Sequence, residues 1–289
     1  MIKGNIVALV TPMNSDCSLD LDCLARLIDY HCEKGTAGVV VAGSTGESAT
    51  LSVAEHALLI EKSVEFANGR IPVIAGIGAN ATSEAIELAV LAKQHGAVSG
   101  LSVVPYYNKP TQKGMYAHFT RISEESGLPQ ILYNIPGRSA CDMYNETILR
   151  LAENPMIIGL KDATSNMGRA IELIHNTRDD FALYAGDDDS ALPLMLIGGH
   201  GAISVSANIV PDHINKLCHY ALEGDAKAAC EINSKLYRLH KILGIETNPI
   251  PVKYAMAELG MINHAIRLPL TPLDEQYRQT VMSIVRAAL

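Results

Sequence analysis

Lys161 is the residue whose placement most clearly suggests chemistry. It directly follows the apolar run Met156–Leu160, so its amine is expected at the end of a buried strand. Lysine is rarely buried, and desolvation lowers the pKa of its ammonium group. A fall from about 10.4 to about 7.5 would raise the neutral fraction at pH 7 from roughly one in 2,500 to about a quarter. A neutral amine can form a Schiff base with a carbonyl compound. The alternatives are that Lys161 already lies in the loop after the strand, or that it pairs with Asp162 in solvent.

Hydroxyl groups end other apolar runs and could move protons beside such an imine. Tyr133 lies at the end of the predicted strand that precedes the strand of Lys161, so the two side chains could converge. A phenol can serve as a proton donor and acceptor. Tyr107 and Ser44 end two further runs and could extend a chain of hydroxyls from Tyr133. The alternative for Tyr133 is a tyrosine that is hydrogen-bonded for packing alone.

Two features could bind carboxylates. The turn Gly43–Glu47 joins a predicted strand to a helix, and its backbone N–H groups and two hydroxyls could cradle a small anion. Arg138 follows the strand of Tyr133 and could form a bidentate contact with a second carboxylate. Taken alone, the first is also compatible with an ordinary strand-to-helix loop and the second with a surface arginine.

Two other patterns are weaker. Gly76–Ala81 superficially fits a dinucleotide-binding fingerprint, but no acidic residue lies near position 100, where the ribose contact belongs. Asp187–Asp189 could bind Mg²⁺, although an acidic loop that caps the next helix is favoured. Histidines and cysteines are scattered without metal-ligand spacing, so neither a metal nor a cofactor is expected.

The elements that must position these side chains repeat along the chain. Short, nearly continuous apolar runs are typical of strands buried on both faces, and helical patterns lie between them. Asp20 is predicted to cap one such helix, and Ser52 with Glu55 forms a capping box for the next. Eight repeats predict an α/β fold, a (β/α)₈ TIM barrel over residues 1–224, with an open doubly wound sheet as the second choice. Residues 225–289 are predicted to be a C-terminal helical appendage packed on the barrel. The eight runs are 6–12, 38–47, 71–79, 100–108, 129–136, 156–164, 181–188 and 201–208.

Composition excludes several classes of function. Among 289 residues, 23 Lys and Arg oppose 31 Asp and Glu, which gives a net charge of −8 and no general attraction to nucleic acid or anionic lipid. No apolar run approaches the roughly 18 residues of a membrane span, and the N-terminus is not that of a signal peptide. Six scattered cysteines fit reduced thiols. We therefore expect a cytoplasmic protein without nucleic-acid or membrane partners.

The chain resembles the dihydrodipicolinate synthase family of Schiff-base-forming pyruvate aldolases, essentially from end to end. Several long motifs occur in the right order, which makes the resemblance specific. The segments that carry it are GSTGESATL (43–51), IPVIAGIGAN (71–80), VVPYYNKP (103–110), QILYNIPGR (130–138), GLKDAT (159–164), GGHGAISVSAN (198–208) and NPIPVK (248–253).

This resemblance implies an aldol condensation in the diaminopimelate route to lysine, without a cofactor. Lys161 would form an imine with pyruvate, and the derived enamine would attack aspartate semialdehyde. Tyr133 would move protons, linked to Ser44 and to Tyr107 from the neighbouring subunit. The family also implies a homotetramer built from two tight dimers.

Substrate and inhibitor contacts follow from the same resemblance. Thr45 and the backbone at Ile203 would hold the pyruvate carboxylate, and Arg138 would bind that of the semialdehyde. Feedback inhibition by lysine is implied by a set that matches lysine-sensitive members: Ser48, Ala49, His56, Asn80, Glu84 and Tyr106.

The sequence departs from the family pattern at two positions, and two rival functions remain. Ser44 replaces the usual Thr, which keeps the hydroxyl but frees its rotamer. Val53 stands where lysine-sensitive members carry a polar residue, so inhibition is expected to be weaker. N-acetylneuraminate lyase shares the lysine, the tyrosine and the glycine-rich turn, but Arg138 favours a second small carboxylate as ligand. The other rival is a non-catalytic barrel that senses a small acid.

Overall fold

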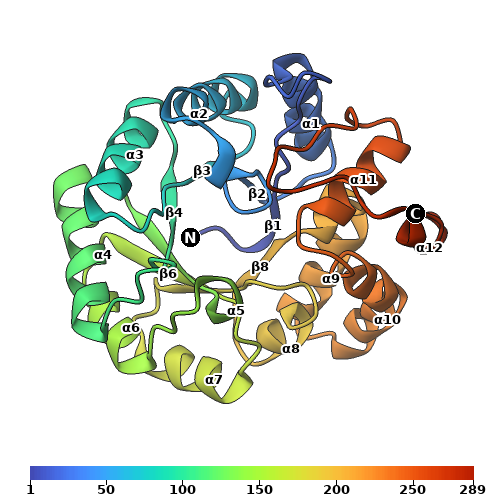
Figure 1. Cartoon of the computed structure of the whole chain (residues 1–289). Helices are drawn as coiled ribbons and strands as arrows, with labels where there is room; N and C mark the ends of the chain where they lie inside the picture. Colours follow the sequence, from blue (N-terminus) through green and yellow to red (C-terminus); the bar gives the residue numbers. More distant parts are fainter.

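Eight parallel strands pair in chain order, and the last returns to the first (Figure 1). The sheet therefore closes into the predicted barrel, and an open doubly wound sheet is excluded. We describe all residues, 1–289, from a computed structural model. The strands are β1 (Gly4–Ala8), β2 (Gly38–Val41), β3 (Val73–Gly76), β4 (Ser99–Val103), β5 (Gln130–Asn134), β6 (Ile157–Asp162), β7 (Ala182–Ala185) and β8 (Gly201–Ser204).

Helices surround the barrel, and their predicted caps are confirmed. The Asp20 side chain accepts the N–H of Cys23 at the start of α1, and Ser52 with Glu55 forms the capping box of α2. The helices up to the last strand are α1 (Leu21–Glu33), α2 (Val53–Ala67), α3 (Thr82–Gln94), α4 (Gln112–Ser126), α5 (Pro136–Ser139), α6 (Asn145–Ala152), α7 (Met167–Asn176) and α8 (Ala191–Leu196), with α9 (Pro211–Leu222) after β8 and short 3₁₀ turns at Ser48–Thr50 and Ser206–Asn208.

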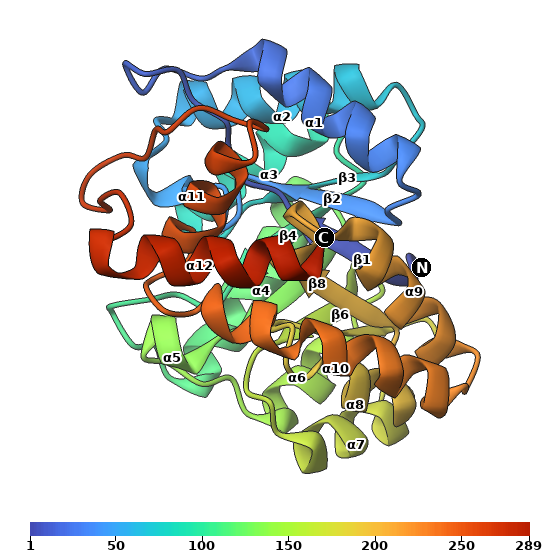
Figure 2. The same ribbon diagram turned by 90° about the vertical axis from the view of Figure 1, so that its right-hand side faces the viewer.

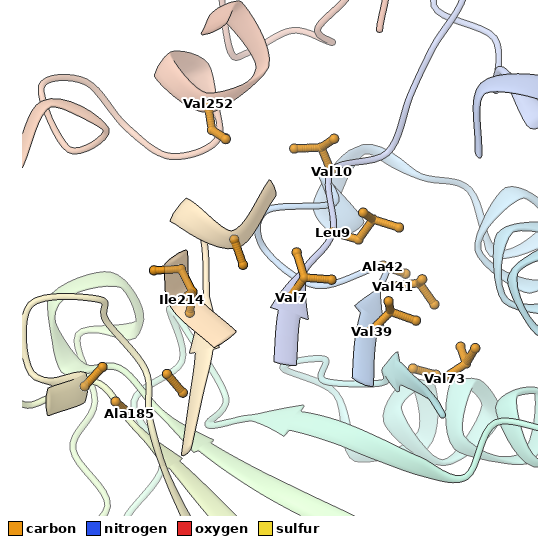
Figure 3. Close-up of a cluster of buried hydrophobic side chains, with 14 of the residues drawn as sticks. Val7, Leu9, Val10, Val39, Val41, Ala42, Val73, Ala185, Ile214 and Val252 are labelled. Carbon is orange, nitrogen blue, oxygen red and sulfur yellow. The ribbon is translucent and has the colours of Figure 1, made fainter. Parts of the chain in front are cut away.

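Alternation along the strands divides the core into two layers. Ile6, Val40 and Ile203 belong to a cluster of 10 buried residues inside the barrel. Their neighbours Val7 and Val39 face outward into a cluster of 68 buried residues between strands and helices, part of which Figure 3 shows. Successive side chains of a strand point to opposite faces, so a continuous apolar run fills both layers.

The chain after residue 224 is helical, as predicted. It forms α10 (Ala226–Ile242), α11 (Ile250–Glu258) and α12 (Glu275–Ala288). In Figure 2, α12 crosses the side of the molecule between α10 and α11, and it contacts both. Val252 of α11 belongs to the same outer core cluster as Val10, and Figure 3 labels both. None of the helices combines the length and hydrophobicity needed to cross a bilayer.

Candidate active site

A cavity of about 250 Å³ opens at the carboxyl ends of the strands. In (β/α)₈ enzymes this end of the barrel holds the active site. The wall combines side chains from strand ends with side chains from the C-terminal helical region. Its polar and charged members are Ser44, Thr45, Ser48, Tyr133, Arg138, Lys161, Asp187, Asp188, Asp189, His240 and Asn248.

Lys161 lies in this cavity near the end of β6. Leu160 packs in the outer core, so the alternation of the strand turns Lys161 to the barrel interior. Its side chain is only 5% exposed, and burial lowers the pKa of the ammonium from 10.5 to about 8. The nearby carboxylates of Asp188 and Asp187 oppose that shift. Roughly a tenth of the amine is therefore neutral at pH 7, which makes Lys161 a competent nucleophile.

Tyr133 is the closest aromatic neighbour of this amine. It pairs directly with Lys161 across β5 and β6, and the Lys161 Nζ lies 4.3 Å from the centre of the Tyr133 ring. Burial raises the pKa of the phenol above its ordinary value of 10. The hydroxyl is therefore protonated at neutral pH and available as a donor.

Asp187 and Asp188 are tied to the ends of β7 and β8. The Asp187 Oδ1 accepts the N–H of Ser190, the residue before α8, but no side chain caps the first turn of α8, so the predicted capping of this helix by the acidic loop is wrong. The Asp188 Oδ2 accepts the N–H groups of Val205 and Ser206. Both carboxylates are thus held beside Lys161. No group of three or more His, Cys, Asp or Glu side chains is arranged to hold a metal ion.

The Gly43–Glu47 turn brings Thr45 to the cavity. Gly76 permits this placement, because a Cβ there would lie 2.0 Å from the carbonyl oxygen of Ala42. The Asn248 Nδ2 donates to the Thr45 Oγ1 at 2.9 Å, and the Asn248 carbonyl accepts a hydrogen bond from Arg138. Because Oγ1 accepts from the amide, its own hydrogen is free to point at a ligand.

Sequence reasoning assigned no role to Asn248 or to the neighbouring His240. Asn248 begins the NPIPVK motif, which carries part of the family resemblance but points to no particular role for the residue. His240 lies on α10, and its Nδ1 is 2.8 Å from the Ser206 Oγ. A His in a helical pattern carries no signal of its own, and only the folded chain brings it to a strand end.

The other predicted active-site residues lie in three different places. Ser44 lines the cavity without a hydrogen bond from its side chain, and Ile203 is buried in β8 within the inner core. Tyr107 does not line the cavity: it is 88% exposed, with a left-handed φ of 73° that disfavours a tyrosine.

A second cavity of about 570 Å³ adjoins the first, and they share wall residues that include Ser44, Ser48 and Arg138. Five of the six residues predicted for lysine binding line it: Ser48, Ala49, His56, Glu84 and Tyr106. Asn80 does not, and its carbonyl accepts a hydrogen bond from the Asn108 amide. Val53 also lines this cavity. The His56 Nε2 donates to the Gly76 carbonyl at 2.6 Å.

A (β/α)₈ barrel with a buried, partly neutral lysine at its strand ends defines a lyase that acts through a Schiff base. The model of the Dihydrodipicolinate synthetase family matches residues 1–288. A 4-hydroxy-tetrahydrodipicolinate synthase from Thiobacillus denitrificans is 56% identical over 286 residues, which cover 99% of this chain and 97% of the relative. The chain belongs to the dihydrodipicolinate synthetase family.

Solved structures agree with that assignment. The fold matches the chloride-inhibited dihydrodipicolinate synthase from Acinetobacter baumannii complexed with pyruvate, with a TM-score of 0.98, 49% identity and coverage of 100% of this chain and 99% of the other. It also matches the enzyme from Cyanidioschyzon merolae with lysine bound, with a TM-score of 0.96, 38% identity and coverage of 99% and 98%.

Proposed function

We propose that this chain condenses pyruvate with aspartate semialdehyde, which is the reaction of a 4-hydroxy-tetrahydrodipicolinate synthase and the first committed step of the diaminopimelate route to lysine. The observation that carries the mechanism is the buried Lys161, whose lowered pKa supplies a neutral amine beside a protonated phenol. The pyruvate complex of the A. baumannii relative supports pyruvate as the first substrate.

The reaction begins at Lys161. Its neutral amine adds to C2 of pyruvate, and loss of water gives an imine. Removal of a proton from C3 turns the imine into an enamine, whose C3 forms the new carbon–carbon bond with the aldehyde carbon of the semialdehyde. The aldehyde oxygen takes up a proton and becomes a hydroxyl. The amino group of the semialdehyde can then attack C2, close the ring and release the Lys161 amine.

Tyr133 supplies and accepts the protons of these steps. Because the Lys161 amine lies over the Tyr133 ring, the phenol would lie near C2 of the bound pyruvate, and its raised pKa keeps a proton available for the hydroxyl that leaves as water. Ser44 of the same subunit and Tyr107 from the neighbouring subunit extend this relay toward solvent. The exposure of Tyr107, outside the cavity of its own subunit, supports its contribution to a neighbouring one.

Two sets of donors hold the two carboxylates. The Thr45 hydroxyl, which Asn248 leaves free to donate, binds the pyruvate carboxylate together with the backbone at Ile203. Arg138, on the same wall, binds the carboxylate of the semialdehyde with its guanidinium group. With its carboxylate held by Thr45 and the backbone at Ile203, pyruvate would present its C2 to Lys161.

Each subunit supplies its Tyr107 to the active site of a neighbour, so the enzyme must be at least a dimer. We propose a homotetramer of two such dimers. We also propose that residues 1–224 form the catalytic barrel and that residues 225–289 are packed on it as an accessory region. The enzyme acts in the cytoplasm, where the six free thiols of the chain would remain reduced.

Lysine is the proposed inhibitor, bound in the second cavity. Glu84 offers a carboxylate for an ammonium group there. The lysine complex of the C. merolae relative supports this assignment. Val53 contributes an apolar wall where a polar contact would be stronger, so we expect weaker inhibition than in members with a polar residue.

A steady-state assay tests the acceptor. The enzyme is incubated with pyruvate and either aspartate semialdehyde or N-acetylmannosamine, and pyruvate consumption is followed. Preferred turnover of the semialdehyde is expected. If Arg138→Ala loses this turnover and additional pyruvate does not restore it, the carboxylate of the semialdehyde binds at Arg138. Preferred turnover of the sugar would instead assign a sialic-acid lyase. Consumption of neither would favour the sensor.

A further inference from the structure

A buried ion pair joins the C-terminal region to the turn that carries Thr45. The Lys253 Nζ of α11 lies 2.5 Å from the Glu47 Oε1, and the two side chains are 4% and 0% exposed. The second carboxylate oxygen, Oε2, accepts the backbone N–H of Arg267 at 3.0 Å. Glu47 is therefore held by two separate parts of the C-terminal region.

This pair differs from the other ion pairs of the chain. Every other acidic partner has a side chain that is at least 30% exposed. Burying two charges carries a desolvation penalty that their attraction does not reliably offset, and an apolar pair of similar volume is often no less stable. Stability alone is thus a weak reason for the pair, whereas a fixed geometry is a sufficient one.

The position of Glu47 shows what that geometry affects. Glu47 adopts a left-handed φ of 57°, two residues after Thr45, and its N–H donates to the Ser44 carbonyl. Between them, the Gly46 carbonyl accepts the Thr11 hydroxyl at 2.7 Å. The turn is short, so a displacement of Glu47 rotates the backbone that carries Thr45 and Ser44.

The same C-terminal segment also contacts the middle of the turn. Asn248 lies five positions before Lys253, and its amide donates to Thr45. Asn248 and Lys253 therefore hold the turn from one connected stretch, at Thr45 and at Glu47. The first contact orients a hydroxyl, and the second fixes the backbone that presents it.

We propose that Lys253 is a positioning residue, which acts through Glu47 to hold the Gly43–Glu47 turn in the shape that binds the pyruvate carboxylate. This inference rests on the proposed function, because it assigns the turn to pyruvate. Under this proposal the C-terminal region helps to shape the substrate site, in addition to packing on the barrel.

The test removes both charges while keeping side-chain size. In the double variant Glu47→Gln/Lys253→Met no buried charge is left unpaired, so we expect a melting temperature close to that of the wild type. The turn loses its fixed geometry, and KM for pyruvate rises about tenfold or more, since small misplacements of a binding group are costly. KM for aspartate semialdehyde changes by about twofold or less, because Arg138 lies outside the turn.

Lys62→Met is the matched control, because it removes a lysine from the exposed pair with Glu65 on α2, the helix that follows the turn. It should leave both KM values unchanged. If the double variant does not fold, Glu47→Asp replaces it. The two charges stay paired, but the carboxylate is one methylene shorter, so it can reach the Lys253 Nζ and the Arg267 N–H only if the turn moves, and KM for pyruvate must still rise.

Unchanged KM for pyruvate in the folded variant would overturn the proposal, whether or not its melting temperature falls. Trapping of pyruvate on the wild-type enzyme with borohydride separates this failure from that of the proposed function. A wild-type adduct with an unchanged variant KM would refute only the positioning role. Absence of the wild-type adduct would refute the function on which the role rests.

Discussion

The Lys161 Nζ lies 4.3 Å from the centre of the Tyr133 ring, and the two residues are direct partners across β5 and β6. Strand register, rather than a flexible loop, therefore fixes the distance between the Lys161 amine and the Tyr133 ring. Burial has opposite effects on the two groups: it frees a neutral amine and retains a phenolic proton. One apolar environment prepares both partners of the proposed imine chemistry.

The buried amine should make stability depend on pH. The folded pKa of Lys161 is lowered to about 8, so between about pH 8 and 10.5 the unfolded chain binds more protons and the folded state gains stability as pH rises. The shift corresponds to a cost of about 3 kcal/mol below pH 8. Lys161→Met removes that cost. Calorimetric melting should give the variant the higher melting temperature at pH 7, with a difference that shrinks toward pH 10.

Lys62→Met is the control for this measurement, since the Lys62 side chain is 29% exposed and its ammonium pairs with Glu65 at the surface. A difference between Lys161→Met and the wild type that stays constant from pH 7 to 10 would show that Lys161 is not perturbed by burial.

Removal of the Tyr133 hydroxyl should slow the chemistry. We expect Tyr133→Phe to lower kcat by about 10²–10⁴-fold, the usual contribution of a positioned proton donor, with a much smaller change in KM for pyruvate. Tyr184→Phe is the matched control: Tyr184 is another buried tyrosine of the barrel, but its hydroxyl donates to the Ile2 carbonyl. A kcat for Tyr133→Phe equal to that of the control would exclude the proton-transfer role.

Exchange of Tyr107 between subunits should allow complementation. Tyr107→Phe and Lys161→Ala are each expected to lower activity strongly. In a mixed dimer, the Tyr107→Phe subunit keeps Lys161 and receives an intact Tyr107 from its partner. Activity should therefore return when the two variants are unfolded together and refolded as a mixture. If the mixture is no more active than its components, or if Tyr107→Phe alone loses no rate, the intersubunit relay is wrong.

Glu84 should govern inhibition without affecting catalysis. Glu84 lines the second cavity but not the first. Loss of its charge in Glu84→Gln removes the partner of an ammonium group and should weaken lysine inhibition about tenfold, as expected for a charged hydrogen bond. KM for pyruvate should not change. Inhibition by lysine measured at a range of concentrations checks this, and an unaltered inhibition curve would remove Glu84 from the site.

The sequence was sufficient to predict the barrel, because buried parallel strands are continuous apolar runs that recur with helices between them. It also placed Lys161 and Tyr133 at strand ends, where barrel geometry makes side chains converge. Both predictions depend on local patterns. The capping interactions of Asp20 and Ser52 are local as well, and the structure confirms them.

The contacts made by the C-terminal region could not be predicted in the same way. Asn248 bonds to Thr45 across 203 positions, and Lys253 pairs with Glu47 across 206. Helix α11 also lacks a polar face that would mark it, since Pro251, Val252 and Lys253 are all buried. Long-range pairs between single polar residues leave no periodic trace in one sequence.

The central claim is that Lys161 is the Schiff-base nucleophile, and borohydride trapping tests it most directly. The enzyme is incubated with pyruvate, reduced, and examined by intact mass and peptide mapping, with Lys161→Ala and enzyme without pyruvate as controls. The account predicts one pyruvate-derived adduct per chain, on the peptide that contains Lys161, and none in either control. A folded wild-type enzyme without an adduct, or an adduct that persists in Lys161→Ala, would contradict it.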